Sequence, residues 1–147
     1  MRAPCEVGVT ESHQNRILVV EDDPGLRAVY AETLELSGYE VRRAADGAEA
    51  MAILSSGWTP CAVFLDLRMP GVDGWELSRQ LRAQAEWSAI PVVVLAAHYR
   101  IDREARDVGA VAWLQKPFDL HRLEDVARSA CRMAHEQDPL RQSAGER

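Results

Sequence analysis

The 147-residue sequence lacks any apolar run of the roughly 18 residues that a membrane-spanning helix needs. It also lacks a basic surplus, because 23 acidic residues against 17 Lys and Arg give a formal net charge of -6. Binding to nucleic-acid phosphates needs a basic stripe. Residues 1–14 contain no apolar segment of the kind found in secretory signals. These absences argue against membrane and nucleic-acid partners and favour a cytoplasmic location.

Cysteine is scarce, with only Cys5, Cys61 and Cys131 in the whole chain. The three are widely spaced and form no C-x-x-C pair, so they indicate neither a zinc site nor a disulfide framework. We therefore expect reduced thiols in a cytoplasmic protein. Cys61 and Cys131 are expected to be buried as small apolar side chains.

The chain does contain enough apolar residues for one globular domain. An apolar fraction of 47% beside 27% charged residues is typical of a folded core, and the length suits a single domain. Regular patterns occupy residues 15–134. Residues 1–14 and 135–147 are polar and aperiodic, and we expect them to be terminal tails.

Short apolar runs alternate with helical patterns along this domain. Four runs are continuous, as expected for strands covered on both faces of a parallel sheet, and one alternates apolar with polar residues, as expected at a sheet edge. The predicted strands span 16–20, 39–43 (the edge strand), 61–65, 91–95 and 111–114. Five alternations of strand and helix predict an α/β fold, an open, doubly wound, five-stranded parallel sheet with helices on both faces.

The helical segments carry local start and stop signals. Asp23 is a good N-cap followed by Pro24, and Gly38 is expected to end the same helix. Asp46 is expected to cap the second helix. The other three helices are predicted over 75–84, 101–108 and 120–134. In sheets of this kind, ligands bind at the carboxyl ends of the strands, so the residues at those ends form the candidate site.

Acidic residues follow two of the predicted strands. Glu21, Asp22 and Asp23 follow the first strand, and Asp66 follows the third. Carboxylates that converge on one pocket repel one another, so their pKa values rise or they bind a hard cation. Oxygen ligands without neighbouring His or Cys suit Mg²⁺, which uses one or two carboxylates and accepts phosphoryl oxygens as further ligands.

Lys116 follows the fifth predicted strand and is the one lysine of the chain, since the other sixteen basic residues are arginines. A compact ammonium and a forked guanidinium bind anions differently. The presence of lysine at this strand end, in a chain that otherwise uses arginine, therefore favours a role for Lys116 that arginine could not perform. An accident of composition is the alternative, and the position of Lys116 between a strand and Pro117 counts against it.

Three segments resemble the receiver domain of bacterial two-component response regulators. ILVVEDDPGLR resembles the first strand and acidic cluster of that family, VFLDLRMPGVDGWEL its phosphoacceptor segment, and GAVAWLQKPF its lysine–proline segment. The three occur in the family's order and spacing, and the resemblance covers residues 15–134. It implies the flavodoxin-like strand order 2-1-3-4-5.

The resemblance also implies a role for each residue at the strand ends. Asp66 would accept a phosphoryl group from a sensor histidine kinase or a histidine phosphotransfer protein. Glu21, Asp22, Asp66 and the backbone carbonyl of Arg68 would hold Mg²⁺, with Glu21 acting through water. Lys116 would bind the phosphoryl oxygens after a cis Lys–Pro bond. Such a domain catalyses only its own phosphorylation and dephosphorylation and is otherwise not an enzyme.

Two predicted switch positions differ from the residues that are usual in the family. The family usually has Thr or Ser where this chain has Ala96, so the hydroxyl that bonds the phosphoryl group is missing. Trp113 occupies the position of an aromatic switch residue, and a core tryptophan on a buried strand is an equal alternative. Arg68 and His98 flank the pocket, where they either tune the lifetime of the acyl phosphate or are simply solvated.

We expect a stand-alone receiver whose phosphorylation changes a protein-interaction face. Nothing after residue 134 could form a DNA-binding helix pair, so the output is expected to be contact with an unknown downstream protein. The face would comprise the helix 101–108, the strand 111–114 and the helix 120–134, and it could also form a homodimer.

Two other functions compete with this interpretation. A degenerate receiver would serve as a phosphorylation-independent docking or dimerisation module; Ala96 favours it, and the intact set of Glu21, Asp22, Asp66 and Lys116 argues against it. An aspartyl-nucleophile hydrolase would place its nucleophile after the first strand, commonly as Asp-x-Asp. Here Asp66 follows the third strand.

Overall fold

The computed structural model describes residues 15–67, 74–97, 106 and 108–137. The regular elements of this part are β2 (Arg16–Val20), α1 (Pro24–Leu36), β3 (Glu40–Ala44), α2 (Gly47–Ser55), β4 (Ala62–Asp66), α3 (Gly74–Ala83), β5 (Val92–Ala96), β6 (Ala112–Gln115) and α5 (Leu120–Gln137). The helix predicted over 101–108 lies largely outside the described residues. Among the helices described, none is both long enough and apolar enough to cross a bilayer.

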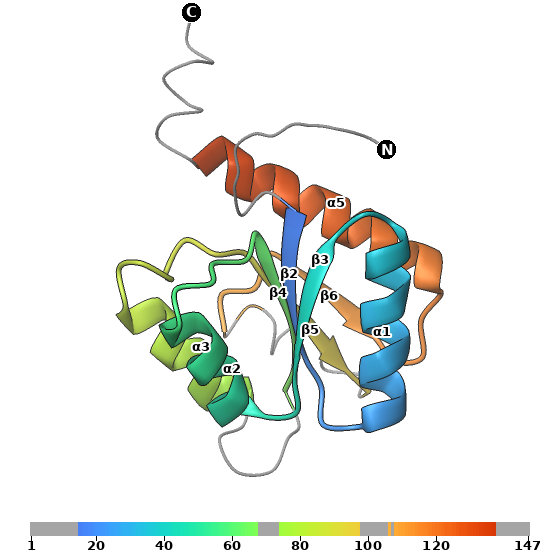
Figure 1. Cartoon of the computed structure of the whole chain (residues 1–147), viewed down its shortest axis with the longest axis horizontal. Coiled ribbons are helices and arrows are strands. Elements are labelled where there is room, and N and C mark those ends of the chain that lie inside the picture. The colour runs from blue at the N-terminus through green and yellow to red at the C-terminus, as the bar shows by residue number, and fades with distance from the viewer. Residues whose placement is uncertain (1–14, 68–73, 98–105, 107, 138–147) are drawn as a thin grey trace, which may run out of the picture.

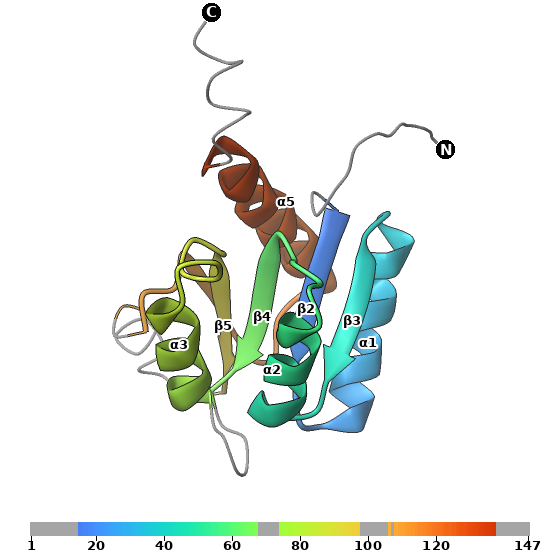
Figure 2. The ribbon, with the colours of Figure 1, turned by 60° about the vertical axis from the view of Figure 1, so that its left-hand side comes forward.

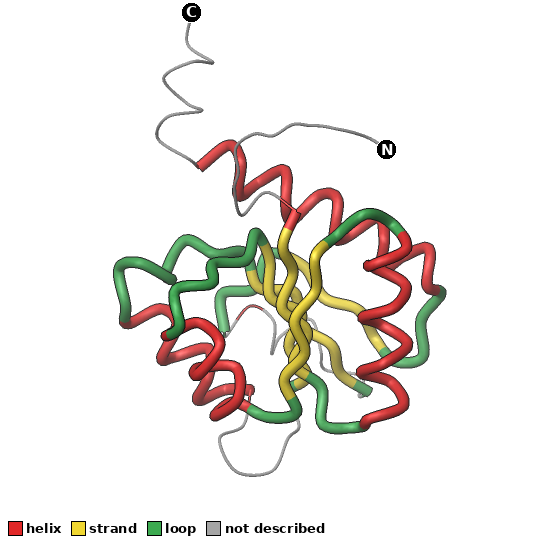
Figure 3. The backbone as a smooth tube through the Cα atoms, in the orientation of Figure 1, coloured by secondary structure: helices red, strands yellow, loops and turns green. Residues whose placement is uncertain are grey.

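The strands form one parallel sheet in the order β3-β2-β4-β5-β6 (Figure 1). Counted along the chain, this order is 2-1-3-4-5, so the predicted fold is confirmed. Because all strands run the same way, their carboxyl ends lie at the same edge of the sheet, where the arrowheads of Figure 2 point. Figure 3 shows the same strands lying between helices on either side. β4 is central, with β2 on one side and β5 on the other.

Helices cover both faces of the sheet, α1 and α5 on one and α2 and α3 on the other (Figure 2). Successive side chains of a strand point to opposite faces, so each strand contributes to both cores. Every residue of β4 and β5 is buried. The core beneath α1 and α5 includes Ile17, Val19, Leu34, Phe64, Leu95 and Leu123. The core beneath α2 and α3 includes Leu18, Val20, Leu54, Val63, Leu65 and Leu77.

Both predicted helix caps are confirmed. The carboxylate of Asp23 accepts the backbone N–H of Leu26 at 3.1 Å, with Pro24 in the first turn. Asp46 accepts the backbone N–H of Glu49 at 2.9 Å. α1 ends before Gly38, whose φ of +104° is the left-handed conformation that glycine adopts at helix ends. The two aspartate caps fix where the chain passes from strand to helix, after β2 and after β3.

Several boundaries differ from the sequence-based expectation. Asp66 and Ala96 are themselves the last residues of β4 and β5. The strand predicted as buried over 111–114 is β6, an edge strand in which only Leu114 is buried. The apolar composition of this segment predicted a strand covered on both faces. β6 instead lies at the edge of the sheet, with β5 as its one strand neighbour, and its side chains are less covered than those of the central strands. α5 continues to Gln137, past the predicted boundary at 134.

The expectation of reduced thiols at Cys61 and Cys131 is wrong, because the two residues form a disulfide. Their Cα atoms are 5.0 Å apart although 70 residues separate them in the sequence. The expectation that both are buried is confirmed, at 0% and 4% exposure. Cysteine spacing gave no sign of the pair, since only the packing of α5 across the sheet brings Cys131 to Cys61.

Gly74 provides a test of the close packing beneath the site. A Cβ atom there would lie 2.5 Å from the Cα of Leu67 and 2.7 Å from the carbonyl oxygen of Asp66. Both are backbone atoms, so Gly74→Ala is expected to destabilise the fold by about 1–3 kcal/mol in urea unfolding. Gly25→Ala is the matched control, since its Cβ would meet only a side-chain oxygen of Asp23 at 3.3 Å. Equal losses in the two variants would contradict the packing argument.

Candidate functional site

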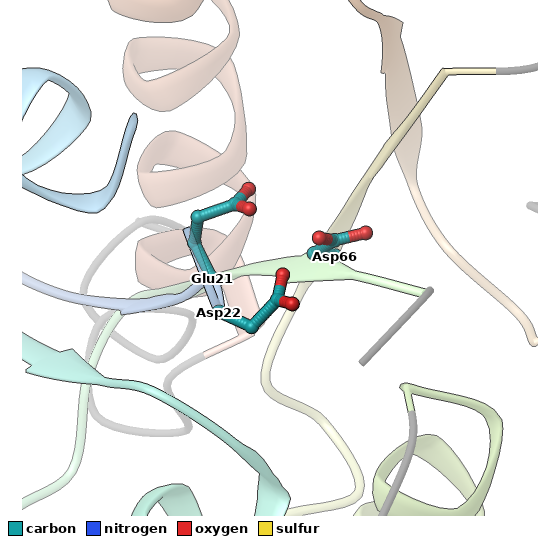
Figure 4. A group of neighbouring side chains, drawn as sticks. All are labelled: Glu21, Asp22 and Asp66. Carbon is teal, nitrogen blue, oxygen red and sulfur yellow. The ribbon is translucent and has the colours of Figure 1, made fainter. Parts of the chain in front are cut away.

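Three carboxylates lie together at the carboxyl edge of the sheet (Figure 4). Glu21 and Asp22 follow β2, and Asp66 ends the neighbouring strand β4. Each offers an oxygen that lies within 4.8 Å of the others. Glu21 and Asp66 are 1% and 4% exposed, whereas Asp22 is exposed. The structure thus brings together the three carboxylates predicted from the sequence.

The register of the sheet places these groups. Val20 of β2 pairs with Leu65 of β4, so the residues that follow them, Glu21 and Asp66, come side by side. The backbone N–H of Glu21 still donates to the carbonyl of Ala44 at 3.0 Å, which ties this position to β3. An apolar strand with both faces covered can carry polar side chains only at its end. The continuous apolar runs therefore determine where the carboxylates appear.

Lys116 provides a positive charge beside the cluster. Its Nζ atom lies 2.7 Å from Oε1 of Glu21 and 3.4 Å from Oδ2 of Asp66. Its backbone N–H donates to the carbonyl of Ala96 at 2.7 Å. The Lys116–Pro117 bond is cis, as the resemblance implies. The lysine is therefore held at the same edge as the three acids and bridges two of them.

Burial and the neighbouring charges shift the pKa values of Glu21 and Lys116. Burial raises the pKa of Glu21 to about 7; the hydrogen bond from Lys116 opposes that rise, and the charge of Asp66 adds to it. Burial lowers the pKa of Lys116, but the hydrogen bond to Glu21 and the charge of Asp66 outweigh burial and raise it overall. The ammonium therefore stays charged at neutral pH. Among the described residues, this one cation faces three carboxyl groups, so the described part of the site has more acidic than basic side chains.

The ligand atoms of this cluster fit Mg²⁺. All three residues offer carboxylate oxygens, with no imidazole or thiolate among them, and hard divalent cations prefer such oxygens. Glu21, Asp22 and Asp66 would hold the ion, which would supply positive charge beside Asp66. The fourth predicted ligand, the carbonyl of Arg68, lies outside the described residues.

Arg27 is a residue of the site that the sequence interpretation missed. Its guanidinium donates to the backbone carbonyl of Glu21 at 2.8 Å and to that of Asp22 at 3.4 Å. From the first turn of α1 it therefore holds the backbone of the acidic segment in place. The available signal was an arginine soon after an acidic segment, but arginine on a helix is ordinarily solvated. Only the structure shows that this one turns back to the backbone.

The remaining predicted positions have mixed outcomes. Ala96 is buried at the end of β5 and presents a methyl group where the resemblance leads us to expect the hydroxyl of Thr or Ser. Trp113 is 40% exposed, so the interpretation as a core tryptophan is wrong. Its role as a switch residue stays a prediction. His98 lies outside the described residues.

The raised pKa of Glu21 predicts how stability depends on pH in the metal-free protein. Folded Glu21 keeps its proton up to about pH 7, whereas the unfolded chain releases it near 4.5. Folding stability should therefore fall as pH rises from about 4.5 to about 7, by up to about 3 kcal/mol. Urea unfolding in EDTA should show this decline in the wild type and a smaller one in Glu21→Gln. Identical pH profiles would show that Glu21 is not the group responsible.

Curated relatives match most of this chain. Response regulator MprA of Mycolicibacterium vanbaalenii is 38% identical over 131 residues, which cover 88% of this chain and 55% of the relative. RpaA of Synechocystis, described as a DNA-binding dual master transcriptional regulator, is 35% identical over 119 residues. That match covers 80% of this chain and 49% of RpaA. The chain spans about half the length of the curated relatives it matches.

Solved structures of single domains match along nearly their full length. The receiver domain of NtrX from Brucella abortus has a TM-score of 0.72 and 34% identity, over 79% of this chain and 98% of that one. The chemotaxis protein CheY4 of Vibrio cholerae has a TM-score of 0.72 and 31% identity, over 78% and 97% of the two chains. Residues 17–128 match the family model of the response regulator receiver domain. This match, together with the carboxylate cluster and the strand order, shows that the chain belongs to the response regulator receiver family.

Proposed function

We propose that this receiver accepts a phosphoryl group on Asp66 from the phosphohistidine of a sensor histidine kinase or a histidine phosphotransfer protein. Receiver domains interact with histidine kinases and generally bind Mg²⁺ through an acidic pocket. The observation that carries the proposal is the position of Asp66. It ends a buried central strand, with two further carboxylates beside it and the Lys116 ammonium 3.4 Å away.

The proposed reaction is a displacement at phosphorus. An Oδ atom of Asp66 bonds to phosphorus while the P–N bond of the phosphohistidine breaks, and the electron pair of that bond stays on the imidazole. The protein supplies position and charge neutralisation. Glu21 and Asp22 would hold Mg²⁺ with Asp66, and the Lys116 ammonium would bind the phosphoryl oxygens. The domain would catalyse only this transfer and the hydrolysis of its own acyl phosphate.

The output of the proposed switch is contact with a downstream protein in the cytoplasm. The described part of the face consists of β6 and α5, where Trp113 and Leu120 are exposed, together with the exposed Val111 just before β6. Phosphorylation would change this face, and a homodimer could use it too. A formal net charge of -6 supports a protein partner over nucleic acid.

A second candidate function is phosphorylation-independent docking or dimerisation by a degenerate receiver. Ala96 favours it, because the methyl group at the end of β5 cannot bond a phosphoryl oxygen. The same exposed face of β6 and α5 would serve. The pairing of Lys116 with Asp66 and Glu21 favours the first proposal, because a docking module needs no such charge arrangement.

Phosphoryl uptake tests the nucleophile directly. Incubation of the chain with a small acyl-phosphate donor and Mg²⁺ should add one phosphoryl group, measured by intact mass. Asp66→Asn should lose the uptake, because an amide oxygen is a far weaker nucleophile. Asp46→Asn is the matched control, since asparagine also caps helices, and it should be labelled like the wild type. Uptake that persists in Asp66→Asn would assign the acceptor elsewhere.

The missing hydroxyl at position 96 should leave the switch weak. A hydrogen bond to a charged group contributes about 1.5–3 kcal/mol, whereas driving a two-state equilibrium from 1:99 to 99:1 takes about 5.5 kcal/mol. Ala96→Thr should therefore enlarge the amide shift changes that beryllofluoride causes around Trp113. Ala96→Val adds a similar volume without the hydroxyl and should not. Equal responses in the two variants would rule out the hydroxyl as the cause.

A further inference from the structure

We propose that Cys61 and Cys131 form a reversible redox clamp, which holds the C-terminal half of α5 against the sheet. Cys61 directly precedes β4, and its backbone N–H donates to the carbonyl of Arg16 at 2.7 Å, so the sheet holds this sulfur firmly. Cys131 lies in the second half of α5. The disulfide is therefore a covalent link between the central strand and the last helix.

The N-terminal half of α5 has anchors of its own. Leu123 is fully buried, and Val126 packs against the same core. The carboxylate of Glu124 accepts a hydrogen bond from the hydroxyl of Ser37 at 2.8 Å, which ties α5 to the end of α1. Ahead of the helix, Phe118 stacks on a tyrosine of α1 at 5.3 Å between ring centroids. This half should stay in place without the disulfide.

The C-terminal half is held by small side chains. Within residues 127–134, the core-facing side chains are those of Ala127, Ala130, Cys131 and the partly buried Ala134. An alanine methyl removes far less apolar area from water than a leucine side chain, and hydrophobic stabilisation scales with that area. The disulfide is thus the strongest connection of residues 127–134 to the sheet. Figure 2 shows this half of α5 running toward the end of the sheet where the strands begin.

Closing the clamp is a two-electron oxidation. The two thiols lose two protons and two electrons, and a low-molecular-weight disulfide such as oxidised glutathione takes them up to become two thiols. The exchange proceeds by thiolate attack through a mixed disulfide, and excess thiol reverses it. Because both sulfurs are buried, exchange requires local opening of α5. The clamp should therefore respond slowly, at a rate set by that opening.

The clamp and the carboxylate cluster lie at opposite ends of β4. Cys61 and Asp66 are five residues apart in the sequence, which corresponds to about 16 Å along a strand. Opening the clamp should loosen α5, part of the proposed interaction face, and leave the carboxylates in place. The proposal does not depend on phosphorylation, so the two can be tested separately.

The test compares the full chain in oxidised and reduced glutathione. Cys5→Ser serves as the matched background, since it removes the third thiol and leaves the pair. Thiol alkylation and intact mass should show no free thiol in the oxidised buffer and two in the reduced buffer. In hydrogen exchange, amides of residues 127–134 should exchange about tenfold or more faster after reduction. Amides of residues 120–126 and of β4 should not change.

Two substitutions check the assignment. Cys61→Ala and Cys131→Ala should each give the fast amide exchange of residues 127–134 in both buffers. Should a variant fail to fold, the unsubstituted pair still allows the clamped and open states to be compared, by measuring exchange before and after reduction. Free thiols at both positions in oxidised glutathione would overturn the proposal. Identical exchange of residues 127–134 in the two buffers would overturn it too. Phosphoryl uptake should be equal in the oxidised and the reduced protein. Loss of uptake on reduction would contradict the inference that the clamp and the carboxylate cluster, at opposite ends of β4, act separately.

Discussion

A parallel sheet covered by helices on both faces has room for polar side chains only at the ends of its strands and along its edge strands. The rest of this structure depends on that constraint. β2 is apolar from Ile17 to Val20 and β4 from Ala62 to Leu65, so Glu21 and Asp66 can appear only where these apolar runs end. Their pairing side by side follows from the register of neighbouring strands. Burial of the carboxyl group, with the charge of Asp66 adding to it, raises the pKa of Glu21 to about 7. A site for a cation is thus a consequence of how the strands end.

Lys116 places a positive charge beside the carboxylates of the cluster. Its ammonium is shared between Glu21 and Asp66, with the shorter contact to Glu21. In the proposed reaction, additional positive charge beside the carboxylates would weaken the hold of Glu21 on the ammonium, which could then bind the phosphoryl oxygens. An arginine could not make this change as readily, because its planar fork binds carboxylates in a fixed geometry. The single lysine of the chain therefore has a physical reason to occupy this position.

The fold and most of the site could be predicted because their signals are local. An apolar run followed by an acid, an Asp–Pro helix start and one lysine before a proline can each be found in a few adjacent residues. Arg27 and Trp113 could not be predicted in this way. Whether Arg27 turns to solvent or to the carbonyls of Glu21 and Asp22 depends on the path of the acidic segment. Whether Trp113 is covered depends on what lies beyond the edge of the sheet.

The disulfide was missed for the same reason, yet the strand order explains it. β6 is the edge strand, so the helix that follows it must turn back over the sheet to cover the apolar face of the central strands. That path carries the second half of α5 across the start of β4, where Cys61 lies. A contact between residues 70 apart is therefore a product of topology, and cysteine spacing carries no trace of it. Because β4 bears Cys61 at its start and Asp66 at its end, one rigid strand supports two chemical groups and also keeps them apart.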